Sequence, residues 1–396
     1  RPERTVGIVA AVPAGRLRRI KGGEEGKAPM ATTETSPEAS TTRDDASVLG
    51  LPGQLVAAIR NAMDIARMGR LEQAAKTPYE VVLREPTFSL RRYELDGDDA
   101  RSAPRARKGR KPARRPVLIL VPPLMITSEV YDIAAEGSAV GTLLARGVDP
   151  WVVDFGVPEQ QEGALERTLA DHILACSKAV DHAVEATGGE VHLAGYSQGG
   201  IFVYLAAAYR RSAGIASLIT FGSPVNVHSQ VLPGVPDEVA VPLIEALGSV
   251  LAVGFSRTAV PAWLSRNTFR LLSPTKEIQN QVEFLRSLSD RETLARKEGQ
   301  RRFLGGEGFV AWPGPAFREF IEQVIMGHRL FSGRFVGEGH TVAMADISCP
   351  VLAFVGENDD IARPPTVRSV ADAAPRAELW EASIRAGHMG LVVGSR

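Results

Sequence analysis

Residues 190–200 read EVHLAGYSQGG and separate a short β-type run from an apolar run of helical character. The run at 191–194 is typical of a strand, and the run at 201–208 is typical of a buried helix. Between them the pattern G-x-S-x-G puts Ser197 at the centre of a sharp turn. The two glycines keep strand and helix from colliding, and the turn holds its central residue in a strained conformation. The stretch therefore predicts a strand, a tight turn and a helix in immediate succession.

A serine in such a turn has the position of a nucleophile elbow. Its Oγ projects above the sheet, and the helix that follows points its N-terminus at the place where an oxyanion would form. We expect the backbone N–H of Gln198 to be one oxyanion donor. The loop after the apolar run PVLILVPPLMI, residues 116–126, is expected to supply the second donor, from Leu124 or from Met125.

The composition bounds the class of protein. The 396-residue chain is 44% hydrophobic and 23% charged, with a formal net charge of zero, which is typical of a globular protein and does not favour nucleic acid as the main partner. Cys176 and Cys349 lie far apart in a predicted helix and a predicted strand, so they indicate neither a disulfide framework nor a metal site. A reducing, cytoplasmic setting fits this usage. No run of about eighteen apolar residues occurs, so we expect no membrane-spanning helix.

Three segments precede the α/β core. Residues 1–49 are poor in aromatic residues and rich in Gly, Thr, Ser, Glu and Arg, which predicts a disordered segment, and a true start at Arg1 or at Met30 is left open. Residues 50–95 predict an N-terminal helix and a hairpin of two strands. Residues 96–115 hold eight Lys or Arg in their last fifteen positions. They predict a solvated loop or, alternatively, a contact with an anionic lipid-body or membrane surface.

Strands and helices then alternate. The first part of the core, residues 116–224, contains four predicted strands with helices between them. The second part, residues 346–396, contains two more strands and a helix. The predicted strands are 116–126, 150–155, 191–194, 215–222, 350–356 and 378–381. This order is the signature of a doubly wound α/β sheet.

An insert at 225–345 separates the two parts of the core and is rich in helical patterns, without a convincing buried strand. Its run at 239–255 is nearly all apolar apart from Glu245. A lid over an apolar substrate channel has this composition, and so does a buried pair of helices. We predict a helical cap and leave those two interpretations open.

A serine nucleophile needs a base within hydrogen-bond reach and a carboxylate that orients the base. Among seven histidines, His388 follows the last predicted strand in a Gly-flanked loop, which fits the chain order serine, acid, histidine. Asp359 directly follows a core strand and is the predicted acid, with Asp360 as its rival and Glu357 behind both. The other histidines are expected to pack, to lie on a helix surface or to lie in the insert: His192; His172 and His182; His228, His328 and His340.

No cofactor is expected. The chain has neither an H-x-x-x-H pattern nor clustered Cys and His at metal-ligand spacing. It also lacks the G-x-x-x-x-G-K-[ST] loop that cradles nucleotide phosphates. The sequence thus predicts chemistry carried by side chains and backbone N–H groups alone.

From about Thr77 to the C-terminus the residues resemble the polyhydroxyalkanoate synthase branch of the α/β-hydrolase superfamily. The resemblance runs through TPYEVVLRE, LRRYEL, PVLILVPPLM, the elbow, VGENDDI and AGHMG. It implies an α/β-hydrolase fold, which is a doubly wound, mostly parallel sheet with a helical cap insert. The spacing of Ser197, Asp359 and His388 looks like that of the family's catalytic triad.

One departure from the family changes the expected chemistry. The polymerases have cysteine at the elbow, where this chain has Ser197. A thiolate holds a growing acyl chain as a thioester, whereas a seryl ester favours hydrolysis or transfer to a hydroxyl. We therefore expect a lipase-like, esterase-like or acyltransferase activity on fatty-acyl or hydroxyacyl esters or thioesters. Acyl polymerisation and non-catalytic binding to lipid bodies or granules are the alternatives.

The chain is also similar to the N-terminal, lipase-like module of mycobacterium-like proteins, in which a fatty-acyl-CoA synthetase module follows. Hydrolase folds usually continue with a helix after the catalytic histidine, and here only residues 389–396 follow His388. This similarity predicts a fragment of a longer protein. We expect a cytoplasmic protein, with association to lipid inclusions or the inner membrane surface as the alternative. The oligomeric state is left open, a dimer included.

Overall fold

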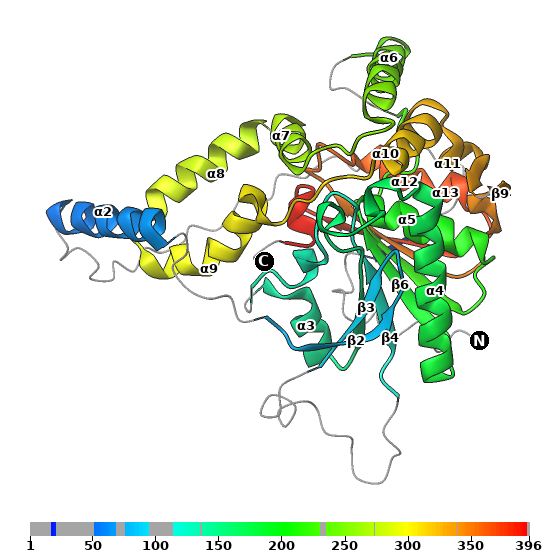
Figure 1. Ribbon diagram of the computed structural model, residues 1–396, viewed down its shortest axis with the longest axis horizontal. Helices are drawn as coiled ribbons and strands as arrows, with labels where there is room; N and C mark the ends of the chain where they lie inside the picture. Colours follow the sequence, from blue (N-terminus) through cyan, green and yellow to red (C-terminus); the bar gives the residue numbers. More distant parts are fainter. Residues whose placement is uncertain are drawn as a thin grey trace, which may run out of the picture.

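The computed structural model describes residues 17–20, 51–68, 76–94, 114–134, 137–229, 235–272, 274–337 and 339–393. At its centre lies a nine-stranded sheet with the order β1-β11-β10-β7-β6-β4-β5-β3-β2 (Figure 1). The strands are β1 (Leu17–Ile20), β2 (Tyr79–Arg84), β3 (Ser89–Tyr93), β4 (Val117–Val121), β5 (Asp149–Asp154), β6 (Val191–Tyr196), β7 (Ile215–Phe221), β10 (Val351–Gly356) and β11 (Leu379–Ile384). The six strands from β11 to β5 are parallel, and the outer strands β1, β3 and β2 are antiparallel to their neighbours. The predicted α/β-hydrolase fold is confirmed.

The strand β1 corrects the prediction of disorder at 1–49. Leu17–Ile20 pairs with β11 in antiparallel register, from Leu17 opposite Ala382 to Ile20 opposite Leu379. The run LRRI has no strong strand pattern of its own. It forms a strand because the edge of the sheet supplies its hydrogen-bond partners. The remainder of 1–49, and all of the basic loop except its last two residues, lie outside the described residues.

Two long helices cover the strands around the elbow. Helix α4 (Leu169–Thr187) packs on β4, β6 and α5, and α5 (Gln198–Tyr209) packs on β6 and β7. Helix α4 begins with a capping box, in which the Thr168 side chain accepts from Asp171 N–H and Asp171 accepts from Thr168 N–H. Helix α5 is apolar on all sides and is buried from Gln198 to Ala208. A helix that is hydrophobic all round belongs inside a layered domain.

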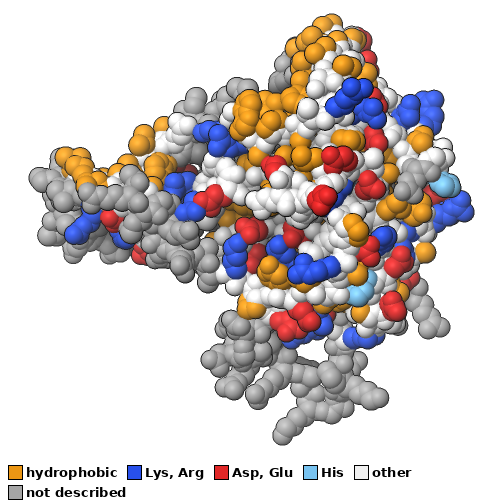
Figure 2. Space-filling view, viewed as in Figure 1, with side chains coloured by type: hydrophobic (Ala, Val, Ile, Leu, Met, Phe, Trp, Pro, Cys, Tyr) orange, Lys and Arg blue, Asp and Glu red, His pale blue; other side chains and the backbone are white. Residues whose placement is uncertain are grey.

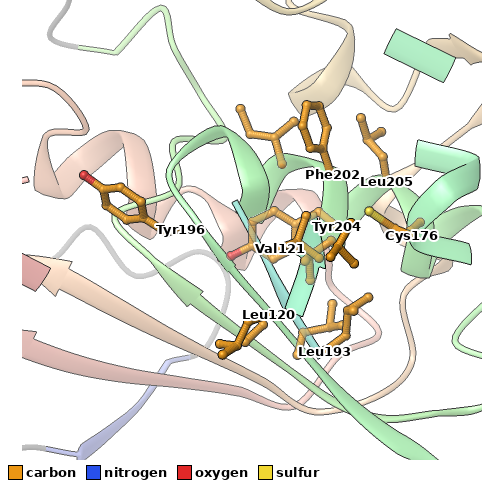
Figure 3. Close-up of a cluster of buried hydrophobic side chains, with 14 of the residues drawn as sticks. Leu120, Val121, Cys176, Leu193, Tyr196, Phe202, Tyr204 and Leu205 are labelled. Carbon is orange, nitrogen blue, oxygen red and sulfur yellow. The ribbon is translucent and has the colours of Figure 1, made fainter. Parts of the chain in front are cut away.

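Buried side chains from these elements form one cluster. Figure 3 labels Leu120, Val121, Cys176, Leu193, Tyr196, Phe202, Tyr204 and Leu205, contributed by β4, α4, β6 and α5. Both cysteines are free and buried, and burial raises the pKa of each thiol. His172 also lies in this region, on α4, and is 1% exposed. The prediction that His172 lies on the surface is therefore wrong, because the side of the helix that carries it faces Phe155 and Phe202.

Within its described residues the insert contains six α-helices: α6 (Asp237–Phe255), α7 (Ala262–Leu272), α8 (Pro274–Ser287), α9 (Arg291–Arg302), α10 (Gly314–Phe320) and α11 (Arg329–Ser332). It also contains a short hairpin that the sequence did not predict, β8 (Phe335–Gly337) with β9 (His340–Val342). The N-terminal helix α2 (Leu51–Met68) lies against this insert rather than against the sheet (Figure 1). Asn61 donates to the Leu288 carbonyl at 2.8 Å, and Arg291 pairs with Asp64 at 2.6 Å.

Helix α6 has an exposed apolar face. Its large outward side chains are Val239, Leu243, Leu247, Val250 and Val253, each 58% to 78% exposed. The opposite face packs on α10 and on the π-helical segment η7 (Ile321–Met326), and its buried residues are small: Ala240, Gly248 and Ala252. Figure 2 shows the resulting hydrophobic surface over α6 at the top of the view. The interpretation as a buried helix pair is therefore wrong for the described residues.

The exposed helix also bears on the expected absence of a membrane span. Among the described residues, α6 is the one helix long and apolar enough to cross a membrane by length and composition alone. Charged side chains occur in it at Asp237, Glu238 and Glu245. In length and composition, α6 therefore differs from the expectation that no helix of this kind occurs.

Candidate active site

The strand–turn–helix prediction at the elbow is confirmed, with Ser197 lying between β6 and α5. Ser197 has φ 54° and ψ −122°, a conformation that L-residues rarely adopt. Its N–H donates to the Phe221 carbonyl of β7 at 2.9 Å, which ties the turn to the next strand. A Cβ on Gly195 would lie 2.4 Å from the Gly199 carbonyl oxygen, and a Cβ on Gly199 would lie 2.1 Å from that of Val121. Both positions therefore require glycine.

His388 and Asp359 meet Ser197 above the ends of the parallel strands. His388 Nε2 lies 2.8 Å from Ser197 Oγ, and His388 Nδ1 lies 2.8 Å from Asp359 Oδ2. His388 is 4% exposed and Asp359 is 3% exposed. Because an ionised carboxylate can only accept, Nδ1 carries the proton and Nε2 is free to accept from the serine hydroxyl. This is the geometry of a nucleophile, a general base and an orienting acid.

The acid is held by its own loop. Asp359 Oδ1 accepts from the backbone N–H groups of Ile361 and Ala362 at 2.9 and 2.8 Å, which leaves Oδ2 for His388. Asp360, the rival from sequence, is exposed, and Glu357 forms an ion pair with Arg368 at 3.1 Å. The structure therefore brings Asp359, and neither rival, to the histidine.

Two neighbours of this group had no distinct signal in the sequence. Gly222 has φ 53°, and a Cβ there would lie 3.0 Å from Asp359 Oδ2 and 3.3 Å from His388 Nδ1. The Tyr196 ring lies 5.1 Å from the His388 ring, and its hydroxyl donates to the Met389 sulfur at 3.0 Å. Burial, to which the Asp359 charge adds, raises the pKa of Tyr196 well above its usual value. Tyr196 is therefore a neutral wall of the site.

The loop after β4 approaches the elbow where the sequence predicted a second oxyanion donor. Of the two candidates there, the Leu124 N–H already donates to the Gln198 side-chain Oε1 at 3.0 Å. The Met125 N–H has no acceptor among the residues that the structure describes. The Gln198 backbone N–H lies at the first position of α5, where helical N–H groups have no partner within the helix.

The remaining histidines lie away from this group. His192 Nδ1 lies 2.8 Å from Ser217 Oγ, which fits its expected packing role. His228 and His328 stack at 4.5 Å in the insert, and His328 Nε2 lies 2.8 Å from Asn226 Oδ1. Among the described residues, no three His, Cys, Asp or Glu side chains are grouped so that they could hold a metal ion.

Comparisons with known proteins agree with the predicted resemblance. No protein-family model matches the chain. The poly(3-hydroxyalkanoate) polymerase subunit PhaC of Allochromatium vinosum is 28% identical over 328 residues, which cover 81% of this chain and 84% of that protein. PhaC of Haloferax mediterranei is 24% identical over 347 residues, covering 87% of this chain and 66% of that protein. The resemblance to the polyhydroxyalkanoate synthase branch is thus confirmed.

Solved structures of lower sequence identity include a lipase and a thioesterase domain. The monoacylglycerol lipase of Paleococcus ferrophilus matches with a TM-score of 0.45 and 18% identity, over 69% of this chain and 87% of that one. A thioesterase domain from the curacin biosynthetic pathway matches with a TM-score of 0.44 and 12% identity, over 82% and 97%. The fold assignment depends on the sheet order and the elbow rather than on these matches. Together with the polymerase relatives, it supports an enzyme of the α/β-hydrolase superfamily.

Proposed function

We propose that this chain transfers acyl groups from esters or thioesters through a covalent acyl-enzyme on Ser197. The observation that carries the proposal is the buried, continuous hydrogen-bond path from Ser197 Oγ through His388 to Asp359, with both contacts at 2.8 Å. A serine hydroxyl needs such a base to become a nucleophile near neutral pH. Fatty-acyl and hydroxyacyl groups are the proposed substrates, and no cofactor takes part.

The proposed reaction has two halves. Ser197 Oγ attacks the acyl carbonyl carbon while His388 Nε2 takes its proton, and Asp359 stabilises the imidazolium that forms. The negative charge on the carbonyl oxygen is stabilised by the Gln198 N–H and a second N–H from the loop after β4. Collapse expels the alcohol or thiol, which receives the proton from His388. A water or an acceptor hydroxyl then attacks the seryl ester while His388 Nε2 takes its proton. The bond from the acyl carbon to Ser197 Oγ breaks, His388 returns the proton to Ser197 Oγ, and the acyl product leaves.

Two further functions are favoured by specific observations. The similarity to polymerase subunits favours acyl polymerisation. In that reaction the acyl group on Ser197 passes to the hydroxyl of another hydroxyacyl group. The exposed apolar face of α6 favours a protein that binds lipid inclusions or a membrane surface, with or without turnover. A cytoplasmic location, with contact to such a surface, is consistent with all of these functions.

The test is active-site labelling with a fluorophosphonate, followed by mass spectrometry of the labelled peptide. Labelling is expected at Ser197 and is expected to disappear in Ser197→Ala and His388→Ala. Asp359→Asn is expected to lower the rate of ester hydrolysis by a factor on the order of 10³–10⁴. Asp360→Asn is the matched control, because it neutralises the adjacent carboxylate, which lies outside the hydrogen-bond path, and it is expected to keep near wild-type activity.

Product analysis separates the candidate functions. Incubation with p-nitrophenyl esters and with 3-hydroxyacyl-CoA is expected to give free acid or a transferred ester. Polymer formed from hydroxyacyl-CoA would establish the polymerase function instead. A folded wild-type chain that is neither labelled nor active would eliminate catalysis, and binding to lipid vesicles without turnover would then support the binding function.

A further inference from the structure

Gln198 contributes more to the elbow than its backbone N–H. The loop at 122–126, here called the oxyanion loop, follows β4 and runs past the start of α5. The Gln198 side chain is 4% exposed, and its Oε1 accepts the Leu124 N–H at 3.0 Å. Because only the oxygen of a carboxamide can accept a hydrogen bond, this contact also sets which way the amide is turned. The side chain next to the nucleophile thus holds a loop 74 residues earlier in the chain.

The other end of the oxyanion loop is attached to the insert. The Met125 carbonyl accepts from Val310 N–H at 3.1 Å, and Thr127 N–H donates to the Gly308 carbonyl at 2.9 Å. Ile126 also forms a bridge with Phe309. The loop is therefore held between the insert on one side and the elbow on the other, where its Leu124 N–H donates to the Gln198 side chain.

This arrangement decides between the two donors that the sequence left open. A backbone N–H that already donates to Gln198 is not available to an oxyanion unless that bond breaks, which excludes Leu124 while the contact persists. The Met125 N–H, which finds no acceptor among the described residues, remains. The second group of the Gln198 amide, Nε2, is buried and has no partner in the described part of the chain. Burying an amide donor without an acceptor is unfavourable. The Gln198 carboxamide therefore stabilises this region through its oxygen, which accepts the Leu124 N–H.

We propose that the Gln198 carboxamide is a positioning residue that fixes the oxyanion loop so that Met125, and not Leu124, supplies the second oxyanion N–H. This inference rests on the acyl-transfer function proposed above. Oxyanion donors accelerate a reaction only when they are held in place before the charge forms. Because one residue supplies both the first donor and the attachment of the second, the separation of the two N–H groups is fixed before the substrate reacts.

The test compares three variants in ester hydrolysis. Gln198→Leu keeps a side chain of similar size and removes the acceptor, and it is expected to lower kcat about 10- to 100-fold with KM within about threefold, since the lost interaction acts in the transition state. Fluorophosphonate is expected to label this variant completely, as it labels wild type, but at a lower rate. Leu124→Pro removes the donor of the same hydrogen bond. The double variant is expected to be no slower than the slower single variant, because both changes break one contact.

Tyr131→Phe is the matched structural control. The Tyr131 hydroxyl donates to the Val121 carbonyl at 2.7 Å, at the base of the same loop, and takes no part in the hydrogen bond between Leu124 and Gln198. This variant is expected to lower the melting temperature while kcat stays within about threefold of wild type. Loss of kcat in Tyr131→Phe equal to that in Gln198→Leu would mean that general loosening, and not the Gln198 contact, lowers the rate.

Amide hydrogen exchange on ¹⁵N-leucine-labelled protein gives a readout that does not depend on activity. The Leu124 amide is expected to be protected in wild type and to exchange at least about tenfold faster in Gln198→Leu, but not in Tyr131→Phe. Unchanged exchange, unchanged kcat, or losses that multiply in the double variant would each overturn the proposal. A wild type that is inactive and unlabelled would refute the acyl-transfer function, and with it the catalytic role of the contact, whatever the Leu124 exchange rate.

Discussion

Ser197 and Gly222 have nearly the same left-handed φ, 54° and 53°, for different reasons. Ser197 is held there by the turn between β6 and α5, which aims its Oγ at His388. Gly222 follows β7 and lies against the acid and the base, where a Cβ would come within 3.0 Å of Asp359 Oδ2. The elbow serine is visible in the sequence as a motif, whereas Gly222 is one glycine among 38.

Gly222→Ala is expected to lower kcat about 10- to 100-fold, because displacement of catalytic groups by about 1 Å can cost that much. The left-handed angle adds a backbone cost of about 1–2 kcal/mol for a residue with a Cβ, so a lower melting temperature is also expected. Steady-state kinetics and thermal denaturation measure both effects. Gly189→Ala is the control, since nothing lies within 4 Å of a Cβ there and its φ is not positive. Equal activity of the two variants would contradict the crowding argument.

Single residues were predictable where the chain order of the fold constrains them. Ser197, Asp359 and His388 each follow a predicted strand, and the carboxyl ends of parallel strands meet at one edge of the sheet. The choice between Leu124 and Met125 was not predictable, because it depends on a side chain from another element. For the same reason, the sequence around Gln198 does not indicate that its side chain holds the loop.

At the scale of elements, α6 differs from most amphipathic helices because its large apolar side chains face solvent. Its small residues face inward, and a Cβ on Gly248 would lie 3.0 Å from Ile321 Cγ2, so the backbone approaches its neighbour closely. Its outward side chains, from Val239 to Val253, extend over about four turns of helix. A contiguous exposed apolar surface of this kind marks an interaction site in a folded protein.

Replacing Leu247 and Val250 together by glutamine is expected to weaken binding to phospholipid vesicles or to phospholipid-coated triacylglycerol droplets by at least about tenfold, because burial of each side chain contributes about 1.5–3 kcal/mol. Vesicle co-flotation measures the effect. The melting temperature and the hydrolysis of a short, soluble ester are expected to stay near wild type, since both side chains are mostly exposed: 58% and 70%.

The matched control is the same pair of changes on α8, Leu285→Gln with Val282→Gln. Those side chains are also exposed, 63% and 39%, but lie on a different helix. If both pairs reduce vesicle binding equally, or neither does, α6 is not a specific lipid contact. A change in oligomeric state in the α6 variant alone would instead identify that face as an interface between two copies.

At the scale of the whole molecule, a buried histidine connects stability to pH. His172 packs on Phe155 at 5.0 Å between ring centroids, and its Nδ1 lies 2.6 Å from the Thr168 carbonyl oxygen. Burial lowers the pKa of His172 from 6.5 to about 4. The unfolded chain therefore binds a proton between these two pH values that the folded chain does not, and stability falls as the pH falls from 6.5 toward 4.

Urea unfolding at pH 7 and pH 5 is expected to show a loss of about 2 kcal/mol from this histidine alone. His172→Gln is expected to be less stable at pH 7, since it disturbs a packed site. Its free energy of unfolding is expected to fall by about 2 kcal/mol less between pH 7 and pH 5 than that of wild type. His182→Gln removes a partly exposed histidine from the same helix and serves as the control. The same pH dependence in both variants would show that His172 is not the origin of the acid sensitivity.

The sequence by itself determined the six parallel strands of the core with the helices between them, the elbow, the three residues that meet at the candidate active site and the existence of a helical insert. These depend on hydrophobic period, turn chemistry and chain order, which are properties of neighbouring residues. Only the tertiary structure decided that Leu17–Ile20 completes the sheet edge, that His172 is buried and that α6 faces outward. It also decided that Gln198 occupies the Leu124 N–H. Each of those outcomes depends on contacts between residues far apart in the chain, and burial and hydrogen-bond pairing exist only once the layers have packed.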